Sequence, residues 1–312
     1  MIEEWKVIVN PNAGINKGEK DWDEISSLLK KYDINFSHIF TKEIGHAIEL
    51  TKEFVKEGYR NFIAVGGDGT LNEVVNGIFS QKFCNSNEIT LASIGIGTGN
   101  DWGKTYNLPT NYEELIKVIK TGNTFIQDIG TVEFSNNEKV IKRYFINIAG
   151  MGFDASVVKR VNKEKIKGKG GTLTYLRNLL LSLIHYKIKN FEIKIDNESI
   201  NGKLFSLGIG IGKYNGNGMK QLPNAIPDDG LLDVTIINKI GKFDVLRNVK
   251  NLYDGTFINH PSVNTYTAKL VTLVSKKTVY LEADGETLGH SPCKFGIITK
   301  ALNVVIDKEF KP

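Results

Sequence analysis

The sequence predicts an α/β fold in its first part and a β-rich fold in its second. Through about residue 129, short apolar runs alternate with longer segments in which apolar residues recur at helical spacing. That alternation is typical of a parallel sheet wound with helices on both faces. Beyond residue 130, strand-like runs dominate. Three of the early apolar runs end in glycine-rich turns, and open α/β sheets bind ligands at that end of their strands.

The strands of the first part are short and rich in β-branched and aromatic residues. We expect them at 5–9, 36–40, 62–65, 90–95 and 125–129. The longer segments between them place apolar residues every three or four positions, which favours helices. We expect these helices at 18–32, 44–58, 70–81 and 111–121. Together they predict a doubly wound parallel-sheet domain over residues 1–129.

The second part, residues 130–300, is predicted to be an antiparallel β-sandwich or barrel-like domain. Strands are expected at 130–135, 141–149, 190–197, 203–212, 231–238, 268–275, 278–283 and 293–299, with a last one at 302–307. One inserted helix, roughly 171–187, interrupts them, and a shorter helix is expected near 242–254. No internal repeat or low-complexity tract occurs.

The most informative motif is the turn Gly66-Gly67-Asp68-Gly69-Thr70. It follows the strand-like run Phe62–Val65 and leads into a segment with helical spacing. Backbone N–H groups in such a turn and the positive end of the following helix both favour a bound phosphate. A plain tight turn between strand and helix would need the same glycines, so the motif alone leaves that reading open.

Further acids and glycines follow other strand-like runs. Asn10-Pro11-Asn12-Ala13-Gly14 follows the first strand, and Gly97-Thr98-Gly99-Asn100-Asp101 follows the run ending at residue 94. Asp284-Gly285-Glu286 follows 279–283, and an acidic loop spans 227–233. Phosphoryl transfer needs amides that hold phosphates, a divalent cation and a base. If the fold brings them together, Asp68, Asp101 and Glu286 can supply both the carboxylate ligands of the cation and the base. Otherwise they are solvated loop acids or helix caps.

This ordered series resembles the diacylglycerol kinase catalytic family of lipid kinases, and most of all its soluble bacterial diacylglycerol kinase and YegS-like branch. The matching segments are residues 10–14, Thr41 with Gly45-His46-Ala47, 66–73, 97–101, 149–155, 227–233 and 284–286. They span nearly the whole chain. NAD kinases share a version of the glycine-aspartate turn, whereas the full series is specific to the family.

The resemblance implies a role for each matching residue. Glu286 would be the general base, and Asp68 and Asp101 would belong to the catalytic metal and water network. Asp229 would bind a second, structural Mg²⁺ together with the backbone carbonyls of Ile226 and Leu231. ATP would be contacted by Asn10, Pro11, Asn12, Ala13, Gly14, Thr41, Gly66, Gly67, Gly69, Thr70, Leu71, Asn72, Glu73 and Thr98.

The resemblance also implies an arrangement and a substrate. A C-terminal tail, about 301–312, would return to the nucleotide-binding domain of residues 1–129, and a nucleotide cleft would lie between that domain and the lipid-binding domain of residues 130–300. The chain would be an ATP- and Mg²⁺-dependent lipid kinase, with diacylglycerol as the first substrate to test. Other lipids, a soluble acceptor as in NAD kinases, or a non-catalytic binding role are the alternatives. The family includes dimers, so a homodimer is left open.

The sequence departs from the family pattern in two turns. Ile15 stands where some members carry a basic residue after the first glycine turn, and Lys17 could replace that residue only if the loop bends. Gly216-Asn217-Gly218 replaces a run of three glycines. Asparagine tolerates a left-handed backbone better than most residues, so this turn is expected to survive.

Composition and charge restrict the class of protein, its partners and its cellular location. With 312 residues, 41% hydrophobic content and a net charge of +5, the chain is predicted to be a two-domain soluble protein that favours anionic partners. The charge is too mild to imply nucleic acid, and no zinc-finger or RNA-binding signature occurs. Cys84 and Cys293 make no disulfide framework. A cytoplasmic location is expected, because the chain starts directly in a strand and has no apolar run of about 18 residues.

A lipid substrate would require an approach to a membrane. A basic run follows the 149–155 motif, at Lys159, Arg160, Lys163, Lys165, Lys167 and Lys169, and precedes the apolar helix expected at 171–187. A basic loop beside an apolar helix can dock on an anionic bilayer, which would place the protein peripherally at the inner membrane surface. The alternative is a core helix beside a solvated loop.

Overall fold

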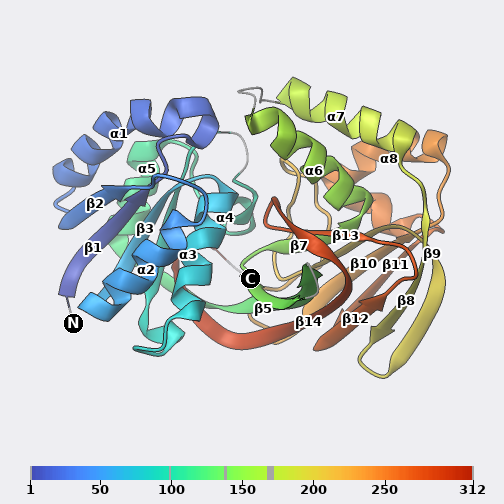
Figure 1. The fold of residues 1–312 in the computed structure, drawn as a ribbon. Helices are drawn as coiled ribbons and strands as arrows, with labels where there is room; N and C mark the ends of the chain where they lie inside the picture. Colours follow the sequence, from blue (N-terminus) through green and yellow to red (C-terminus); the bar gives the residue numbers. More distant parts are fainter. Residues whose placement is uncertain (1, 98–99, 137–138, 167–171, 311–312) are drawn as a thin grey trace. The chain divides into compact units, whose positions relative to one another are not determined.

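The chain divides into two compact units, and each is described by itself. Unit 1 comprises Met1–Asp128 and Lys300–Pro312, and unit 2 comprises Ile129–Thr299. The structure is a computed structural model (Figure 1) that describes residues 2–97, 100–136, 139–166 and 172–310. The functional assignment of the two units, nucleotide binding to the first and lipid binding to the second, stays a prediction at this point.

Unit 1 is built on a parallel sheet with the order β14-β4-β3-β1-β2. Val9 lies opposite Val65 and Val65 lies opposite Ile94, so the carboxyl ends of β1, β3 and β4 are level. The chain's last residues supply the edge strand, because Asn303 and Val304 pair with β4. The strands are β1 (Ile2–Val9), β2 (Phe36–Phe40), β3 (Tyr59–Gly66), β4 (Thr90–Gly95) and β14 (Glu286–Val305), of which β14 begins in unit 2.

Helices cover both faces of this sheet (Figure 1). On one face, Val7, Val9 and Ile63 pack with residues of α1 and α5 such as Trp22 and Ile116. The intervening strand residues are equally buried on the other face, where α2 and α3 pack together and against β3. Apolar side chains at consecutive positions are what a sheet covered on both faces requires. The helices are α1 (Ala13–Lys31), α2 (His46–Glu57), α3 (Asp68–Ser80), η1 (Ser86–Glu88), α4 (Asp101–Thr105) and α5 (Tyr112–Thr121).

Unit 2 is a β-rich unit whose paired strands are antiparallel. Pairings from β9 through β7, β13, β14, β12 and β8 return to β9, which closes a circuit of strands around a core that includes Phe145, Leu207 and Phe295. β10 and β11 extend from β9, and β5 and β6 extend from β14. The strands are β5 (Thr124–Asn136), β6 (Lys139–Phe145), β7 (Ile148–Gly152), β8 (Lys189–Ile195), β9 (Glu198–Gly210), β10 (Leu232–Asn238), β11 (Val263–Ala268), β12 (Leu270–Val274) and β13 (Tyr280–Ala283).

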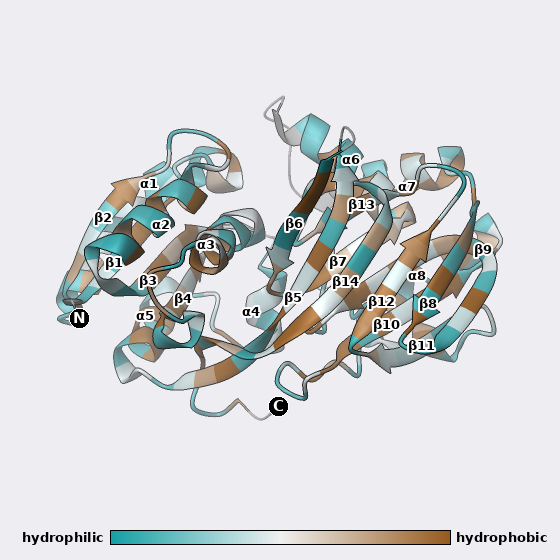
Figure 2. Ribbon diagram, turned by 60° about the horizontal axis from the view of Figure 1, so that its bottom comes forward, coloured by the Kyte–Doolittle hydropathy of each residue, from teal (hydrophilic) through white to brown (hydrophobic). Residues whose placement is uncertain are grey.

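The hydropathy of a strand follows its place in this unit. In β8, Phe191, Ile193 and Ile195 are buried while the residues between them are exposed, and Figure 2 shows the alternation of apolar and polar positions along the strand. Such a period of two is typical of a strand with one face on the core and one in water.

Two helices, not one, interrupt these strands, which corrects the prediction of a single inserted helix. They are α6 (Phe153–Ile166) and α7 (Thr172–His185), and α8 (Lys242–Asp254) and η2 (Thr256–Asn259) follow later. The basic run expected to be a loop is therefore helical as far as Ile166. The reason is the spacing of Phe153, Val157 and Val161, whose side chains recur every four residues and pack with α7 residues such as Leu183.

Several predicted strands have other bounds in the structure. The expected strand at 141–149 is two strands, because the backbone N–H groups of Ile146, Asn147 and Ile148 donate to the carboxylate of Asp284. The expected strand at 268–275 is also divided, between β11 and β12. Conversely, the strands expected at 293–299 and 302–307 form one continuous strand, β14. Among the described helices, none combines the length and apolar character needed to cross a membrane.

Candidate functional site

The glycine turns after β1, β3 and β4 meet at one edge of the sheet of unit 1. The side-chain amide of Asn10 donates to the Thr70 hydroxyl at 2.9 Å, which joins the first turn to the second. The first turn also abuts the third, because a Cβ placed on Gly14 would lie 3.1 Å from Cγ2 of Ile96 and 3.5 Å from Cα of Gly97. The level carboxyl ends of the three strands thus bring together turns that are far apart in the sequence.

Two of these glycines are required by close packing. A Cβ on Gly66 would lie 2.4 Å from the hydroxyl oxygen of Thr70, and one on Gly95 would lie 2.0 Å from the side-chain nitrogen of Asn100. Both distances are far below van der Waals contact, so no larger residue fits without moving its neighbour.

The first turn contains three consecutive residues in left-handed backbone, Gly14 (φ 60°), Ile15 (φ 63°) and Asn16 (φ 60°). Ile15 is β-branched and about half exposed, and a positive φ is a strained conformation for such a residue. Lys17, the proposed substitute for a basic residue in this turn, forms an ion pair with Asp21 at 3.4 Å. The loop therefore bends, but the Lys17 ammonium is directed to a carboxylate of its own helix.

The second turn places the start of α3 at the same edge. Gly67 is the N-cap residue, and no side chain caps this end. The first-turn N–H groups and the helix dipole of this 13-residue helix favour an anion here. The side chains of Thr70 and Leu71, in the first helical turn of α3, are buried. The backbone N–H groups of α3 are therefore the groups available to an anion at this edge of the sheet.

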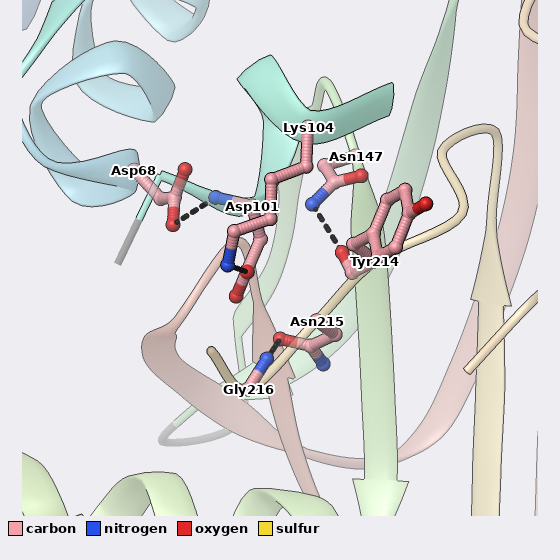
Figure 3. A network of polar contacts seen from close by, with 7 residues as sticks. All are labelled: Asp68, Asp101, Lys104, Asn147, Tyr214, Asn215 and Gly216. Atoms are coloured by element: carbon pink, nitrogen blue, oxygen red, sulfur yellow. Dashed lines mark hydrogen bonds and ion pairs between the residues drawn. The ribbon is translucent and has the colours of Figure 1, made fainter. Parts of the chain in front are cut away.

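Asp68 and Asp101 lie together, as the sequence predicted they should if they share a site (Figure 3). The Asp68 carboxylate accepts a hydrogen bond from the backbone N–H of Asp101 at 3.2 Å. The buried Asp101 carboxylate in turn forms an ion pair with Lys104, with 2.7 Å between Oδ1 and Nζ. Two carboxylates beside a phosphate-favouring turn are oxygen ligands of the kind that Mg²⁺ takes.

Some residues that the resemblance assigns to ATP have structural contacts in unit 1. Glu73 accepts hydrogen bonds from the backbone N–H groups of Gly45 (2.8 Å) and Ala47 (3.1 Å), so it holds the turn before α2. Asn72 is buried and accepts from the side chain of Asn76. Thr41 is buried and its backbone N–H donates to Val9. Thr98, also assigned to ATP, lies outside the described residues.

In unit 2, Glu286 follows a two-residue hairpin turn. Ala283 pairs with Glu286 across the turn Asp284-Gly285, and both turn residues have positive φ, 48° and 81°. An Asp-Gly pair at these two positions is the sequence favoured for the hairpin turn that matches strand twist. The turn fixes Glu286 at the first position of β14, where its side chain is partly exposed.

Asp284 anchors this turn to β7. Its buried carboxylate accepts the backbone N–H groups of Ile146 (2.8 Å), Asn147 (3.1 Å) and Ile148 (3.1 Å), and its own N–H donates to the carbonyl of Ile148. A carboxylate that accepts several N–H groups is a strong, charge-assisted anchor. Asp284, two residues before Glu286, therefore fixes the hairpin that carries Glu286.

The turn at 215–219 confirms the expectation for the altered glycine run. Gly216, Asn217 and Gly218 all have positive φ, of 59°, 71° and 96°, and Asn215 pairs with Met219 across them. The Asn215 side chain accepts from the N–H of Gly216, and the nearby Asn147 amide donates to the carbonyl of Tyr214 (Figure 3). Asn217 thus replaces a glycine without loss of the turn.

The loop at 227–233 carries the acids expected to bind a structural metal. Asp229 is exposed and accepts the N–H of Leu231 at 2.9 Å. Burial and the negative charge of Asp229 raise the pKa of the buried Asp233 to about 7, against the lowering effect of Lys213. The described residues contain no group of three or more His, Cys, Asp and Glu side chains placed to hold a metal. A hard cation would fit here with Asp229, backbone carbonyls and water as ligands.

The sequence of this chain matches two protein families. Residues 4–132 match the family described as the diacylglycerol kinase catalytic domain. Residues 147–306, more than half of the chain, match the family described as the YegS C-terminal NAD kinase beta sandwich-like domain. The chain belongs to the diacylglycerol kinase family. This family membership confirms the prediction of a lipid kinase that uses ATP and an alcohol acceptor.

Relatives of this kinase support the same assignment. A diacylglycerol kinase of Staphylococcus saprophyticus is 28% identical over 311 residues, which cover 100% of this chain and 98% of the relative. A diacylglycerol kinase of Staphylococcus haemolyticus is 29% identical over 304 residues, 97% of this chain and 88% of the relative. A solved Bacillus anthracis protein aligns with a TM-score of 0.80 at 24% identity, covering 99% of this chain and 97% of that one. This structural likeness shows the fold.

Two residues that are not among the predicted site residues contact them or their turns. Lys104 pairs with Asp101. Its spacing, three residues after Asp101 at the start of a helix, was the available signal. Glu282, two residues before Asp284, is fully buried and accepts the N–H of Gly285. No pattern in the sequence distinguishes a buried glutamate of this kind from an exposed strand residue.

Proposed function

We propose that this kinase is a diacylglycerol kinase that transfers the γ-phosphoryl group of ATP to the primary hydroxyl of diacylglycerol, with phosphatidate and ADP as products. The observation that carries the proposal is the meeting of three glycine turns in unit 1 beside the hydrogen-bonded pair Asp68 and Asp101. The curated relatives are named diacylglycerol kinases, which supports this acceptor over other alcohols.

Unit 1 binds ATP in this proposal. The residues from Asn10 to Gly14, those from Gly66 to Glu73, Thr41 and Thr98 form the binding segment. The phosphates lie against the N-terminus of α3, where N–H groups and the helix dipole favour negative charge. Glu73 supports the site indirectly, because its carboxylate accepts hydrogen bonds from the backbone N–H groups of Gly45 and Ala47.

Asp68 and Asp101 would hold Mg²⁺ with the phosphates of ATP. The cation, when bound, neutralises charge on the transferred phosphoryl group. The two carboxylates suit a hard cation, and Lys104 orients Asp101 through their ion pair. Lys104 also adds positive charge near the site.

Glu286 is the proposed general base of the reaction. The lipid hydroxyl gives its proton to the Glu286 carboxylate as its oxygen forms a bond to the γ-phosphorus. The bond between the γ-phosphorus and the bridging oxygen breaks, and ADP leaves with that electron pair. The Asp284-Gly285 turn holds Glu286 on a fixed hairpin.

The test of this role is Glu286→Gln, which keeps size but cannot accept a proton. We expect kcat with diacylglycerol to fall by roughly a thousandfold or more, with an unchanged melting temperature. Glu198→Gln, on an exposed position of β9 in the same unit, is the matched control and should keep full activity. A fully active Glu286→Gln enzyme would remove the assignment.

We also propose that Asp229 binds a structural Mg²⁺ with the backbone carbonyls of Ile226 and Leu231. Support comes from the loop itself, in which the exposed Asp229 lies near a second acid, Asp233, whose pKa is raised by burial and, less, by the charge of Asp229. A divalent cation at this loop would offset that repulsion. Mg²⁺ should therefore raise the melting temperature of the protein without nucleotide, and Asp229→Asn should lose most of that rise. An equal rise in Asp229→Asn would contradict the site.

The lipid would be reached through an apolar and basic surface on α7 and α8, which we propose docks on an anionic bilayer. Ile184 of α7 is 60% exposed and Phe243 of α8 is 81% exposed. The Lys242 ammonium of α8 donates to the carbonyl of Ile184 at 2.5 Å, so the two apolar side chains lie at adjoining helix ends. Exposed Arg247 and Lys250 add positive charge on α8. Apolar and basic residues together favour anionic lipid.

Vesicle sedimentation without nucleotide tests this surface separately from catalysis. The protein should pellet with vesicles that contain phosphatidylglycerol and less with pure phosphatidylcholine, and salt should weaken binding. The double variant Ile184→Ser/Phe243→Ser should stay in solution. Val140→Ser, 74% exposed on β6, is the control. Binding unchanged in the double variant would contradict the proposal and favour a protein partner for this surface.

Two further predictions concern the state of the protein in the cell. The cytoplasmic location and peripheral attachment to the inner membrane surface are tested by fractionation, in which the kinase should divide between soluble and membrane fractions according to salt. The homodimer is tested by light scattering, which should give twice the 34.8 kDa of the chain.

A further inference from the structure

Two acidic side chains of unit 2, the fully buried Glu282 and the partly buried Asp154, lie beside Gly150, and the reaction proposed above does not use them. Glu282 is on β13 and is 0% exposed. Asp154 is in the first turn of α6. Glu282 Oε2 accepts the backbone N–H of Gly285 at 3.0 Å, so one of these carboxyls touches the turn that precedes Glu286.

Side-chain amides hydrogen-bond to both carboxyls, and the Ser206 hydroxyl acts on Asp154 as well. The side-chain nitrogen of Asn215 donates to Glu282 at 3.5 Å and to Gln221 at 3.0 Å, and the Gln221 amide donates to Asp154. Gly150 of β7 provides the space that the two acidic side chains occupy, because a Cβ there would lie 2.4 Å from Glu282 Oε1 and 3.1 Å from Cβ of Asp154. The 149–155 motif of the sequence therefore provides both an acid and the space for its partner.

Among the described residues, no basic side chain forms an ion pair with Glu282 or Asp154. The ion pairs found in the described chain are all in unit 1. The titratable groups that act on Glu282 are Asp154 from α6 and Asp284 from the turn, and both are acidic. Asp154 also acts on Tyr186, whose pKa it raises. Two close carboxyls without a cation do not both ionise at neutral pH. We therefore expect the pair to keep one proton at neutral pH.

We propose that Glu282 is a positioning residue that, by sharing a proton with Asp154, holds the Gly285 backbone and thereby the hairpin that carries Glu286. This role rests on the proposed function of Glu286 as the base. The protonated pair keeps a stable hydrogen bond to the turn. Loss of the shared proton places two negative charges in a buried site, which drives the carboxyls apart and releases the turn.

Other observations agree with such a proton. Burial and the charge of Asp154 raise the pKa of Glu282 to about 8, and burial raises the pKa of Asp154 to about 6. Burial, with the neighbouring Asp154, also raises the pKa of Tyr186 above its usual range, so Tyr186 stays neutral. The pair holds its proton at neutral pH and loses it in the alkaline range.

The test is the dependence of kcat on pH in the wild type, Glu282→Gln and Glu282→Ala. Glutamine mimics the protonated carboxyl, because it keeps an oxygen that accepts from Gly285 and cannot ionise. The wild type should lose kcat with a midpoint near pH 8, and Glu282→Gln should keep at least half of the neutral kcat and lose this alkaline decline. Glu282→Ala should lose at least about tenfold in kcat with KM for ATP within about twofold. Glu192→Gln, exposed on β8, should behave as the wild type.

Three results would overturn the proposal. An alkaline decline in Glu282→Gln equal to that of the wild type would show that another group causes it. A folded but inactive Glu282→Gln enzyme would show that charge, and not the hydrogen bond, is needed. Full activity of Glu282→Ala would show that the contact to Gly285 does not matter. If Glu286→Gln were active while the Glu282 variants behaved as expected, the base assignment would fail, and with it the clause that this role serves Glu286.

Discussion

The Asp68 carboxylate accepts a hydrogen bond from the backbone N–H of Asp101, although 33 residues separate the two in the sequence. They meet because β3 and β4 are parallel neighbours whose ends are level, with Gly66 opposite Gly95. Each aspartate begins the helix that follows its strand. The sheet register therefore creates the acidic centre of unit 1, and the hydrogen bond fixes the distance between its two acids.

Asp68→Asn should lower kcat by roughly a hundredfold or more while the free energy of unfolding changes by less than about 1 kcal/mol. The amide oxygen can still accept from the Asp101 N–H, whereas the charge that a divalent cation requires is lost. Steady-state assays and urea unfolding measure the two quantities. Asp23→Asn, on an exposed position of α1, should change neither. Wild-type activity in Asp68→Asn would exclude this residue from the metal network.

Lys104→Met should lower kcat/KM for ATP by about tenfold, because it removes the cation paired with Asp101 at 2.7 Å. Lys104→Arg should recover part of the loss, since the positive charge returns with different geometry. Lys82→Met, exposed after α3, serves as the control. If both Lys104 variants kept wild-type kinetics, the ion pair would have no role in the site.

Glu73→Ala should destabilise unit 1 by about 1–2 kcal/mol, because the carboxylate accepts the N–H groups of Gly45 and Ala47 at the start of α2. Glu53→Ala, exposed on α2, should cost much less. Chemical denaturation gives both values. Equal stability of the two variants would mean that Glu73 is not an anchor, and would leave ATP contact as its remaining role.

Asp284→Asn should destabilise the protein by about 3 kcal/mol, because a charged acceptor of three backbone N–H groups becomes a neutral one with a single oxygen. Thermal and urea unfolding both report this change. Asp228→Asn, in the loop at 227–233, is a control with the same change of chemistry. A stability loss below about 0.5 kcal/mol would contradict the anchoring role.

The stability of the wild type should fall as pH rises from about 4 through about 8. Asp154 and Glu282 have pKa values raised to about 6 and about 8, above the unfolded values of about 4. The folded state therefore binds more protons than the unfolded state in this range, and each group costs up to about 1.4 kcal/mol per pH unit until it ionises. Glu282→Gln should flatten the upper part of the curve, in urea titrations at stepped pH, and an unchanged slope would contradict the buried proton.

Much of unit 1 was predictable because β1, β3 and β4 contain short apolar runs that end in glycine-containing turns. The strands at 36–40 and 90–95 have the bounds expected from the sequence. Helix α6 was missed, because the apolar spacing of Phe153, Val157 and Val161 is obscured by small and charged residues between them and by the basic residues that follow. The sequence predicted two strands where the structure has the single strand β14. A local pattern does not show that one segment pairs first with strands of unit 2 and then with a strand of unit 1.

The site was predictable where chemistry and spacing coincide and hidden where burial decides the role. Asp68 and Asp101 stood next to glycine turns, and the structure brings them together. Lys104 needed knowledge of the helix that starts at Asp101. Glu282 could not be found from the sequence, because its importance comes from complete burial and from contacts with Asn215 and Gly285, which lie on other segments.

The most direct test of the account is transfer of label from γ-labelled ATP with Mg²⁺ to a panel of lipids in mixed micelles, with NAD as a soluble acceptor. The NAD arm is needed because residues 147–306 match a family described as the YegS C-terminal NAD kinase beta sandwich-like domain. The account predicts label in phosphatidate when diacylglycerol is present, and a rate of labelling lower by roughly a thousandfold or more with Glu286→Gln. Label in another lipid alone would replace the acceptor, and label in NAD alone, or in no acceptor, would contradict the proposed function.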